Sequence, residues 1–82
     1  MTKDQLNSYL AAILTTALET EPNSFPESMA YLALGMSMAK WSVIREVLTS
    51  ASLVTISNNS ISLTAEGREL AHKCQAVAQR SN

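Results

Sequence analysis

The chain has 82 residues, of which 46% are hydrophobic and 16% charged, with a formal net charge of -1. This length fits one domain, and the balance of charge lacks the basic excess of a dedicated nucleic-acid binder, although basic groups can still cluster locally. The single cysteine, Cys74, excludes an internal disulfide. Because the sequence carries neither a signal-peptide pattern nor an apolar run of membrane-spanning length, we expect a soluble, cytoplasmic protein.

The first predicted element is a helix over residues 3–20. Thr2 and Gln5 form a capping-box pattern at its start, and Pro22 cannot continue it. Apolar residues recur every three or four positions, as in an amphipathic helix: Leu6, Tyr9, Leu10, Ile13, Leu14, Ala17 and Leu18.

A helix-turn-helix is predicted over residues 25–52. Its first helix should be capped by Ser24 or Phe25, with Pro26 in the first turn, and should stop at Gly35. The face expected to be buried consists of Met29, Leu32, Ala33 and Met36.

The second helix of this motif should begin after Ser37, a good N-cap residue. We interpret Trp41, which could also stack on a base or a partner, as a core anchor because it belongs to an apolar stripe. That stripe comprises Trp41, Ile44, Leu48 and Ala51.

A β-hairpin is predicted over residues 53–63. Asn58–Asn59 suits a two-residue turn because asparagine tolerates positive φ. Counting outward from this turn pairs Val54 with Leu63 and Ile56 with Ile61, which places the apolar side chains on one side of the ribbon. The agreement of turn and alternation makes the hairpin a firm prediction.

The last predicted element is a helix over residues 64–79, capped by Thr64, with Leu70, Cys74 and Val77 facing inward. His72 and Cys74 are about 200° apart on a helix and cannot share one metal ion. We therefore expect no metal, no cofactor and, since no catalytic set of residues is apparent, no enzyme activity. The fold class expected is mainly α with a small β-hairpin.

Three stretches carry a resemblance to winged helix-turn-helix domains of the prokaryotic transcription-regulator type. Leu34–Ser37 resembles the turn into the recognition helix, and Leu53-Val54 resembles the entry to the wing, with Ser52 where glycine is usual. The segment ISLTAEGRELA, Ile61–Ala71, is similar to the wing-to-helix segment of that group. The resemblance implies a three-helix core, a wing and a C-terminal helix, and it implies binding of duplex DNA.

In such domains the second helix of the motif enters the major groove and the wing lies beside it. The implied contact residues are Ser37, Lys40, Ser42, Arg45, Asn58 and Asn59. The outward side of the second helix lacks the Arg, Lys, Asn or Gln side chains that read bases by bidentate hydrogen bonds; it consists of Ala39, Ser42, Val43, Glu46 and Ser50. Because the wing tip is also uncharged, binding should be weak and sensitive to salt. Arg45 is open to a second interpretation as a salt-bridge residue. A homodimer through the first and last helices would supply a second half-site.

The alternative hypothesis is a winged helix that associates with protein and does not bind DNA. The same fold also serves as a docking or dimerisation module. The partner face would then consist of Tyr31, Met38, Ala39 and Val43.

Overall fold

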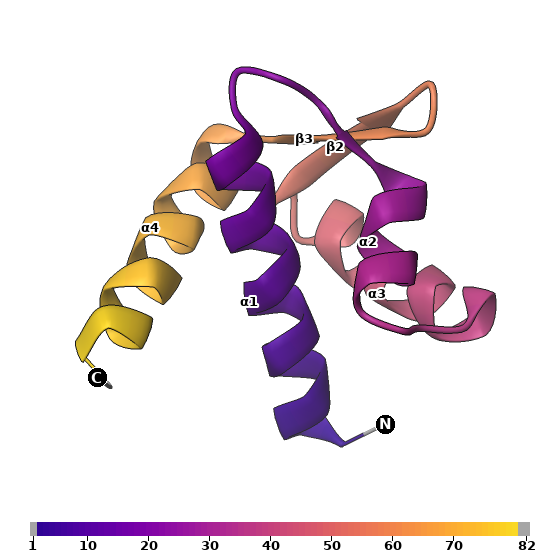
Figure 1. Cartoon of the computed structure of the whole chain (residues 1–82), viewed down its shortest axis with the longest axis horizontal. Helices are drawn as coiled ribbons and strands as arrows, with labels where there is room; N and C mark the ends of the chain where they lie inside the picture. The colour runs from indigo at the N-terminus through magenta and orange to yellow at the C-terminus, as the bar shows by residue number, and fades with distance from the viewer. Residues whose placement is uncertain (1, 81–82) are drawn as a thin grey trace.

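The computed structural model describes the backbone of residues 2–80 and the side chains of residues 2–77. Over these residues the protein is mainly helical with a small antiparallel sheet, in agreement with the predicted fold class. Its elements follow the order α1 (Lys3–Thr20), β1 (Phe25–Pro26), α2 (Glu27–Ala33), α3 (Met38–Ser50), β2 (Val54–Ser57), β3 (Ser60–Leu63) and α4 (Ala65–Arg80). Helix α1 lies between α4 on one side and α2 and α3 on the other, and the sheet closes one end of the helices (Figure 1).

Helix α1 begins and ends where the sequence predicts. The Thr2 hydroxyl accepts a hydrogen bond from the Gln5 amide, and the Gln5 side chain accepts one from the Thr2 amide, each at 3.1 Å. This capping box satisfies two amides that have no partner within the helix. Ile13, Leu14 and Ala17 are buried, so the predicted stripe forms the centre of the core.

The hairpin of β2 and β3 has the predicted register. Val54 lies opposite Leu63, and Ile56 lies opposite Ile61. The turn residues Asn58–Asn59 have φ angles of 53° and 62°, as a two-residue turn of this twist requires. Val54 and Ile61 are buried, so the apolar side of the ribbon faces the helices.

A third strand, β1, was not predicted. Phe25 pairs with Ile61 of β3, on the edge away from β2, and its ring is buried. The predicted start of the second helix at Ser24 or Phe25 is therefore wrong, because α2 begins at Glu27 and Pro26 is extended. The physical reason is the residue order, since a residue that precedes proline favours extended backbone.

The predicted buried face of α2 is also wrong. Met29 and Leu32 are 54% and 70% exposed, and only Met36, beyond the end of the helix, is buried. The inner face instead begins with Glu27 and Ala30, one helical turn apart. With only seven residues, α2 carries too few turns for its hydrophobic spacing to define a face.

The connection to α3 forms as predicted. Gly35 has a φ of +65°, and the Ser37 hydroxyl accepts a hydrogen bond from the Lys40 amide at 3.2 Å. Ala51 is exposed, contrary to the prediction, because it stands at the C-cap after the last turn. The remainder of the predicted stripe is fully buried and consists of Trp41, Ile44 and Leu48.

Helix α4 starts directly after the hairpin, with Thr64 as its cap. The Thr64 hydroxyl accepts a hydrogen bond from the Gly67 amide at 3.0 Å and donates to the carbonyl oxygens of Ser52 and Leu53. A Cβ atom on Gly67 would lie 1.8 Å from the Leu53 carbonyl oxygen. Glycine is therefore required where α4 crosses the entry to β2.

The predicted inward stripe of α4 is wrong in phase. Leu70 and Val77 are 37% and 62% exposed, and Cys74 is half-buried. The buried positions are Gly67 and Ala71, which are four residues apart. Small residues allow α4 to lie close to its neighbours, so the larger apolar side chains are left on the outside.

Candidate functional site

A groove lies between α2, α3 and the turn of the hairpin. Its volume is about 410 Å³. The side chains that line it come from all three elements: Glu27, Ser28, Tyr31, Met38, Trp41, Ser42, Arg45 and Asn59. The groove exists because β1 joins the hairpin to the start of α2, which brings the hairpin turn beside the two helices.

A second hollow, of about 350 Å³, continues this groove along α3 towards β2. It is lined by Ser42, Arg45, Glu46, Thr49 and Ile56. Ser42 and Arg45 belong to both hollows, so they form the ridge between them. Together the two hollows make one surface along α3 with a mixed polar and apolar lining.

Glu27 connects the three walls of the groove. Its side chain is only 11% exposed. Its Oε1 accepts a hydrogen bond from Nε1 of Trp41 at 3.0 Å and lies 3.4 Å from Nε of Arg45. Its backbone amide donates to the carbonyl oxygen of Asn59 at 2.8 Å. A buried carboxylate needs such partners, because burial without them is strongly unfavourable.

Arg45 lies above this carboxylate, and its side chain is 51% exposed. The shortest contact of the ion pair with Glu27 is made by Nε. Of the residues that the structure describes, none accepts a hydrogen bond from the Arg45 guanidinium. The sequence allowed two roles for Arg45, a salt bridge or a contact with a ligand. The observed geometry is compatible with both roles at once.

Two further side chains at the rim have unused hydrogen-bonding capacity. The Ser28 hydroxyl and the Asn59 amide make no hydrogen bond within the described part of the chain. The Ser42 hydroxyl, by contrast, donates to the carbonyl oxygen of Met38 at 2.9 Å. The groove therefore offers donors from α2, from α3 and from the hairpin turn.

The structure separates the residues predicted to contact DNA into two groups. Ser42, Arg45 and Asn59 line the groove. Lys40 and Asn58 are exposed outside it, and the exposed Ser37 uses its hydroxyl as the N-cap of α3.

The residues of the predicted partner face are also separated. Met38 and Tyr31 line the groove, and the Tyr31 ring lies 6.4 Å from that of Trp41 at an angle of 43°. Tyr31 is thus half-buried against the core anchor. Ala39 and Val43 are exposed but do not line the groove.

Sequence reasoning missed Glu27 and Ser28 as members of the site. From the sequence alone, Glu27 indicates only a favourable negative charge near a helix start. Its partners Trp41 and Arg45 lie 14 and 18 positions further along the chain, and no local pattern relates them. Strand β1 occupies Phe25–Pro26, so α2 begins only at Glu27. This start places the Glu27 side chain on the inner face of the helix.

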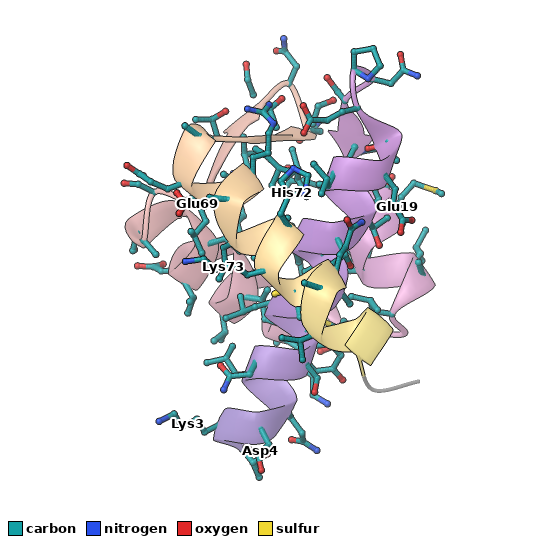
Figure 2. The ribbon with its side chains drawn as sticks, turned by 90° about the vertical axis from the view of Figure 1, so that its left-hand side faces the viewer. Lys3, Asp4, Glu19, Glu69, His72 and Lys73 are labelled. Carbon is teal, nitrogen blue, oxygen red and sulfur yellow. The ribbon has the colours of Figure 1, made fainter. Side chains whose placement is uncertain are left out.

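A second surface of interest lies on α1 and α4. A shallow, largely apolar depression of about 310 Å³ is lined by Ala11, Leu70, Lys73, Cys74 and Val77. Figure 2 shows α4 in front of α1, with Glu69 and Lys73, an ion pair at 3.8 Å, on the same side of α4.

Arg68 of α4 binds Glu21, which follows α1, through two nitrogens. The Nε and terminal nitrogen donate to the two carboxylate oxygens at 3.1 and 2.7 Å. The hydrogen bond from Arg68 lowers the pKa of Glu21 below its ordinary value, and the same bond raises the pKa of Arg68. This pair fixes the start of α4 to the loop after α1.

No known protein family, curated protein or solved structure matches the chain. No three His, Cys, Asp or Glu side chains among the described residues gather as a metal site. Of the helices described, none combines the length and the apolar character needed to cross a lipid bilayer.

Proposed function

We propose that the protein is a cytoplasmic winged helix-turn-helix protein of the transcription-regulator type that binds duplex DNA weakly through α3 and the hairpin. The observation that carries the proposal is the groove between α2, α3 and the hairpin turn, in which Arg45, Ser28 and Asn59 have unused hydrogen-bonding groups. Helix α3 takes the role of the recognition helix, and the β2–β3 hairpin takes the role of the wing. The order of elements, with β1 paired to β3, supports this assignment.

The charges on this surface limit the affinity. Between Met36 and Thr64 the ionised side chains are Lys40, Arg45 and Glu46, a net charge of +1 from two cations and one anion. Arg45 is in addition paired with Glu27. Because phosphate neutralisation supplies most non-specific affinity, binding should be detectable at low salt and lost at moderate salt.

We propose that a homodimer compensates for the weak single contact. Helix α4 lies on the side of α1 away from α3 (Figure 1), so a second copy bound at the apolar depression on α1 and α4 would leave the groove open. Sedimentation of Leu70→Glu should give a monomer, whereas Ala65→Glu, which adds the same charge at the exposed start of α4, should stay dimeric. Equal masses for both variants and the wild type would count against this interface.

The test of DNA binding is a titration of random-sequence duplex followed by fluorescence anisotropy at about 50 and 200 mM salt. We expect binding at the lower concentration and a steep loss at the higher one. Lys40→Glu should abolish the binding because it reverses one of the two positive charges. Absent binding, or binding that does not change with salt, would overturn the proposal.

A second function is favoured by the exposed apolar side chains of α2. Met29 and Leu32 are largely in solvent, and Met38 and Val43 of α3 are 60% and 53% exposed. Association with another protein would remove these apolar side chains from water, which favours this function. Under this alternative Val43→Glu disrupts a concentration-dependent complex, and Lys40→Glu changes nothing.

A further inference from the structure

We propose that the groove is a cradle for one backbone phosphate of the DNA, in which Arg45 binds the phosphate and Glu27 positions Arg45. This inference rests on the proposed function and specifies the chemistry of its central contact. It predicts that Arg45 contacts the phosphate backbone of the DNA and not the edge of a base. It also assigns a role to Glu27, which the resemblance does not.

The first argument is the orientation of the guanidinium. Glu27 approaches Arg45 at Nε, with 3.4 Å between Nε and Oε1. The two terminal nitrogens make no hydrogen bond within the described part of the chain, so they are donors available to a ligand. An arginine held in this way presents a planar pair of N–H groups, the geometry that recognises phosphate oxygens in a bidentate manner.

The second argument is the unequal burial of the ion pair. The Glu27 side chain is 11% exposed and the Arg45 side chain 51%. The carboxylate contacts the buried Trp41 and pairs with Arg45, whereas the guanidinium reaches the surface. The pair is neutral as a whole, but the part that a ligand meets is the cation.

The third argument is the set of donors around Arg45. Ser28 and Asn59 line the same groove with unused hydrogen-bonding groups. Serine, asparagine and arginine are residue types that commonly contact DNA phosphates. The hydrogen bond from the Glu27 amide to the Asn59 carbonyl fixes the hairpin turn relative to α2, so these donors keep their spacing.

The position of Arg45 favours contact with a phosphate over the reading of a base edge. Arg45 lines the groove beside α2 and the hairpin turn, whereas Ala39 and Glu46, which are exposed on α3 outside this groove, lack a base-reading donor. A cation between two flanking elements is suited to the backbone that runs along the edge of a DNA groove.

The experiment uses the whole chain and measures the dependence of DNA affinity on salt. Each phosphate contact contributes roughly 0.9 to the slope of log K against log salt. Arg45→Ala should reduce the slope by about 0.9 on every sequence tested, and Lys3→Gln, a loss of the same charge at the tip of α1 (Figure 2), should leave it unchanged. If the wild type binds DNA and Arg45→Ala leaves the slope unchanged, the proposed phosphate cradle is wrong. The proposed function is not overturned by that result.

The positioning role of Glu27 is tested by a double-mutant cycle. Arg45→Lys keeps the charge but loses the planar fork, so it should weaken binding about tenfold. In the Glu27→Gln background, where the fork is no longer held, the same replacement should have little effect. If Arg45→Lys weakens binding equally in both backgrounds, Glu27 does not position Arg45. Thermal unfolding of each variant establishes that it is folded at the temperature of the titration.

The source of the phosphate is tested through Trp41, the single tryptophan of the chain, which lines the groove. Duplex DNA should change its fluorescence in the wild type and not in Arg45→Ala. Inorganic phosphate at the same phosphate concentration should have no effect. Saturation by inorganic phosphate alone, with competition against DNA, would assign the groove to a small phosphorylated ligand and overturn the DNA assignment. Absence of any DNA binding by the wild type would instead mean that the proposed function itself is wrong.

Discussion

At the scale of single residues, Glu27 joins parts of the protein that are distant in sequence. Its carboxylate accepts from Trp41 and pairs with Arg45, and its amide binds the hairpin turn at Asn59. Among the described residues, no buried side-chain nitrogen or oxygen lacks a hydrogen-bond partner, as native interiors require. Removal of the Glu27 carboxylate therefore deprives both the Trp41 N–H and the Arg45 guanidinium of this partner.

We predict that Glu27→Ala reduces the free energy of unfolding by about 2–3 kcal/mol, since the Trp41 N–H loses its acceptor while it stays buried. Glu27→Gln should cost about 1 kcal/mol or less, because the amide oxygen can still accept from Trp41. Urea unfolding followed by Trp41 fluorescence measures both. Equal losses for the two variants would mean that the hydrogen bond to Trp41 contributes little.

The Glu21–Arg68 pair predicts a dependence of stability on pH. The pKa of Glu21 in the folded protein is lowered by the hydrogen bond from Arg68, so the folded state binds this proton less readily than the unfolded state. The stabilisation is complete above the ordinary pKa of 4.5 and is lost as the pH falls through the lower, folded-state pKa. Glu21→Gln should therefore lose less stability than the wild type between pH 5 and the acid limit. Parallel melting-temperature curves for the two proteins would contradict this assignment.

At the scale of elements, the hairpin and α1 could be predicted from sequence because two independent signals agree in each. In the hairpin the Asn58–Asn59 turn and the alternation specify one register, and in α1 the capping box and the apolar stripe specify the same helix. The boundaries and the cap of α3 follow from Gly35 and Ser37 in the same way.

The faces of α2 and α4 could not be predicted in this way. Both helices pack through small or polar residues, Glu27 and Ala30 in α2 and Gly67 and Ala71 in α4, while their larger apolar side chains point outwards. The hydrophobic pattern of a sequence marks the positions of large apolar side chains. Close approach of two backbones instead requires small side chains, so the buried face is not the one that the pattern marks. The same limit applies to the site, where Ser42, Arg45 and Asn59 were predicted but Glu27 becomes visible only with strand β1 in place.

The contact of α4 with the entry to β2 provides a prediction at this scale. Gly67→Ala should reduce stability by about 3 kcal/mol or more, because the new methyl group would overlap the Leu53 carbonyl oxygen, which belongs to the backbone. Gly35→Ala meets open space and only opposes a φ of +65°, so it should cost about 1–2 kcal/mol. Chemical denaturation measures both variants, and the reverse order of the two losses would contradict the close approach.

The hairpin turn allows stability and binding to be separated. Asn58 has a φ of 53° and does not line the groove. Asn58→Ala should lose about 1 kcal/mol because alanine opposes this conformation, whereas Asn58→Gly should be nearly neutral. Neither replacement should change DNA affinity at a temperature where both variants are folded. A loss of affinity in Asn58→Gly without a loss of stability would place Asn58 among the contacts.

At the scale of the whole molecule, the two candidate surfaces lie on different sides of α1. The groove is formed by α2, α3 and the hairpin, and the apolar depression is formed by α1 and α4 (Figure 1). One surface can therefore bind a ligand while the other binds a second copy. The single core of this small domain holds the two surfaces in fixed positions relative to one another.

A map of backbone amide shifts in the ¹⁵N-labelled protein, titrated with duplex DNA at low salt, tests most directly whether the groove binds DNA. We predict that the largest changes occur at Ser28, Ser42 and Asn59, with a change at the side-chain Nε of Arg45. Leu70 on α4 and Leu32 on the outer face of α2 should be unaffected. Changes centred on either of those two residues, or no changes at all, would contradict the account.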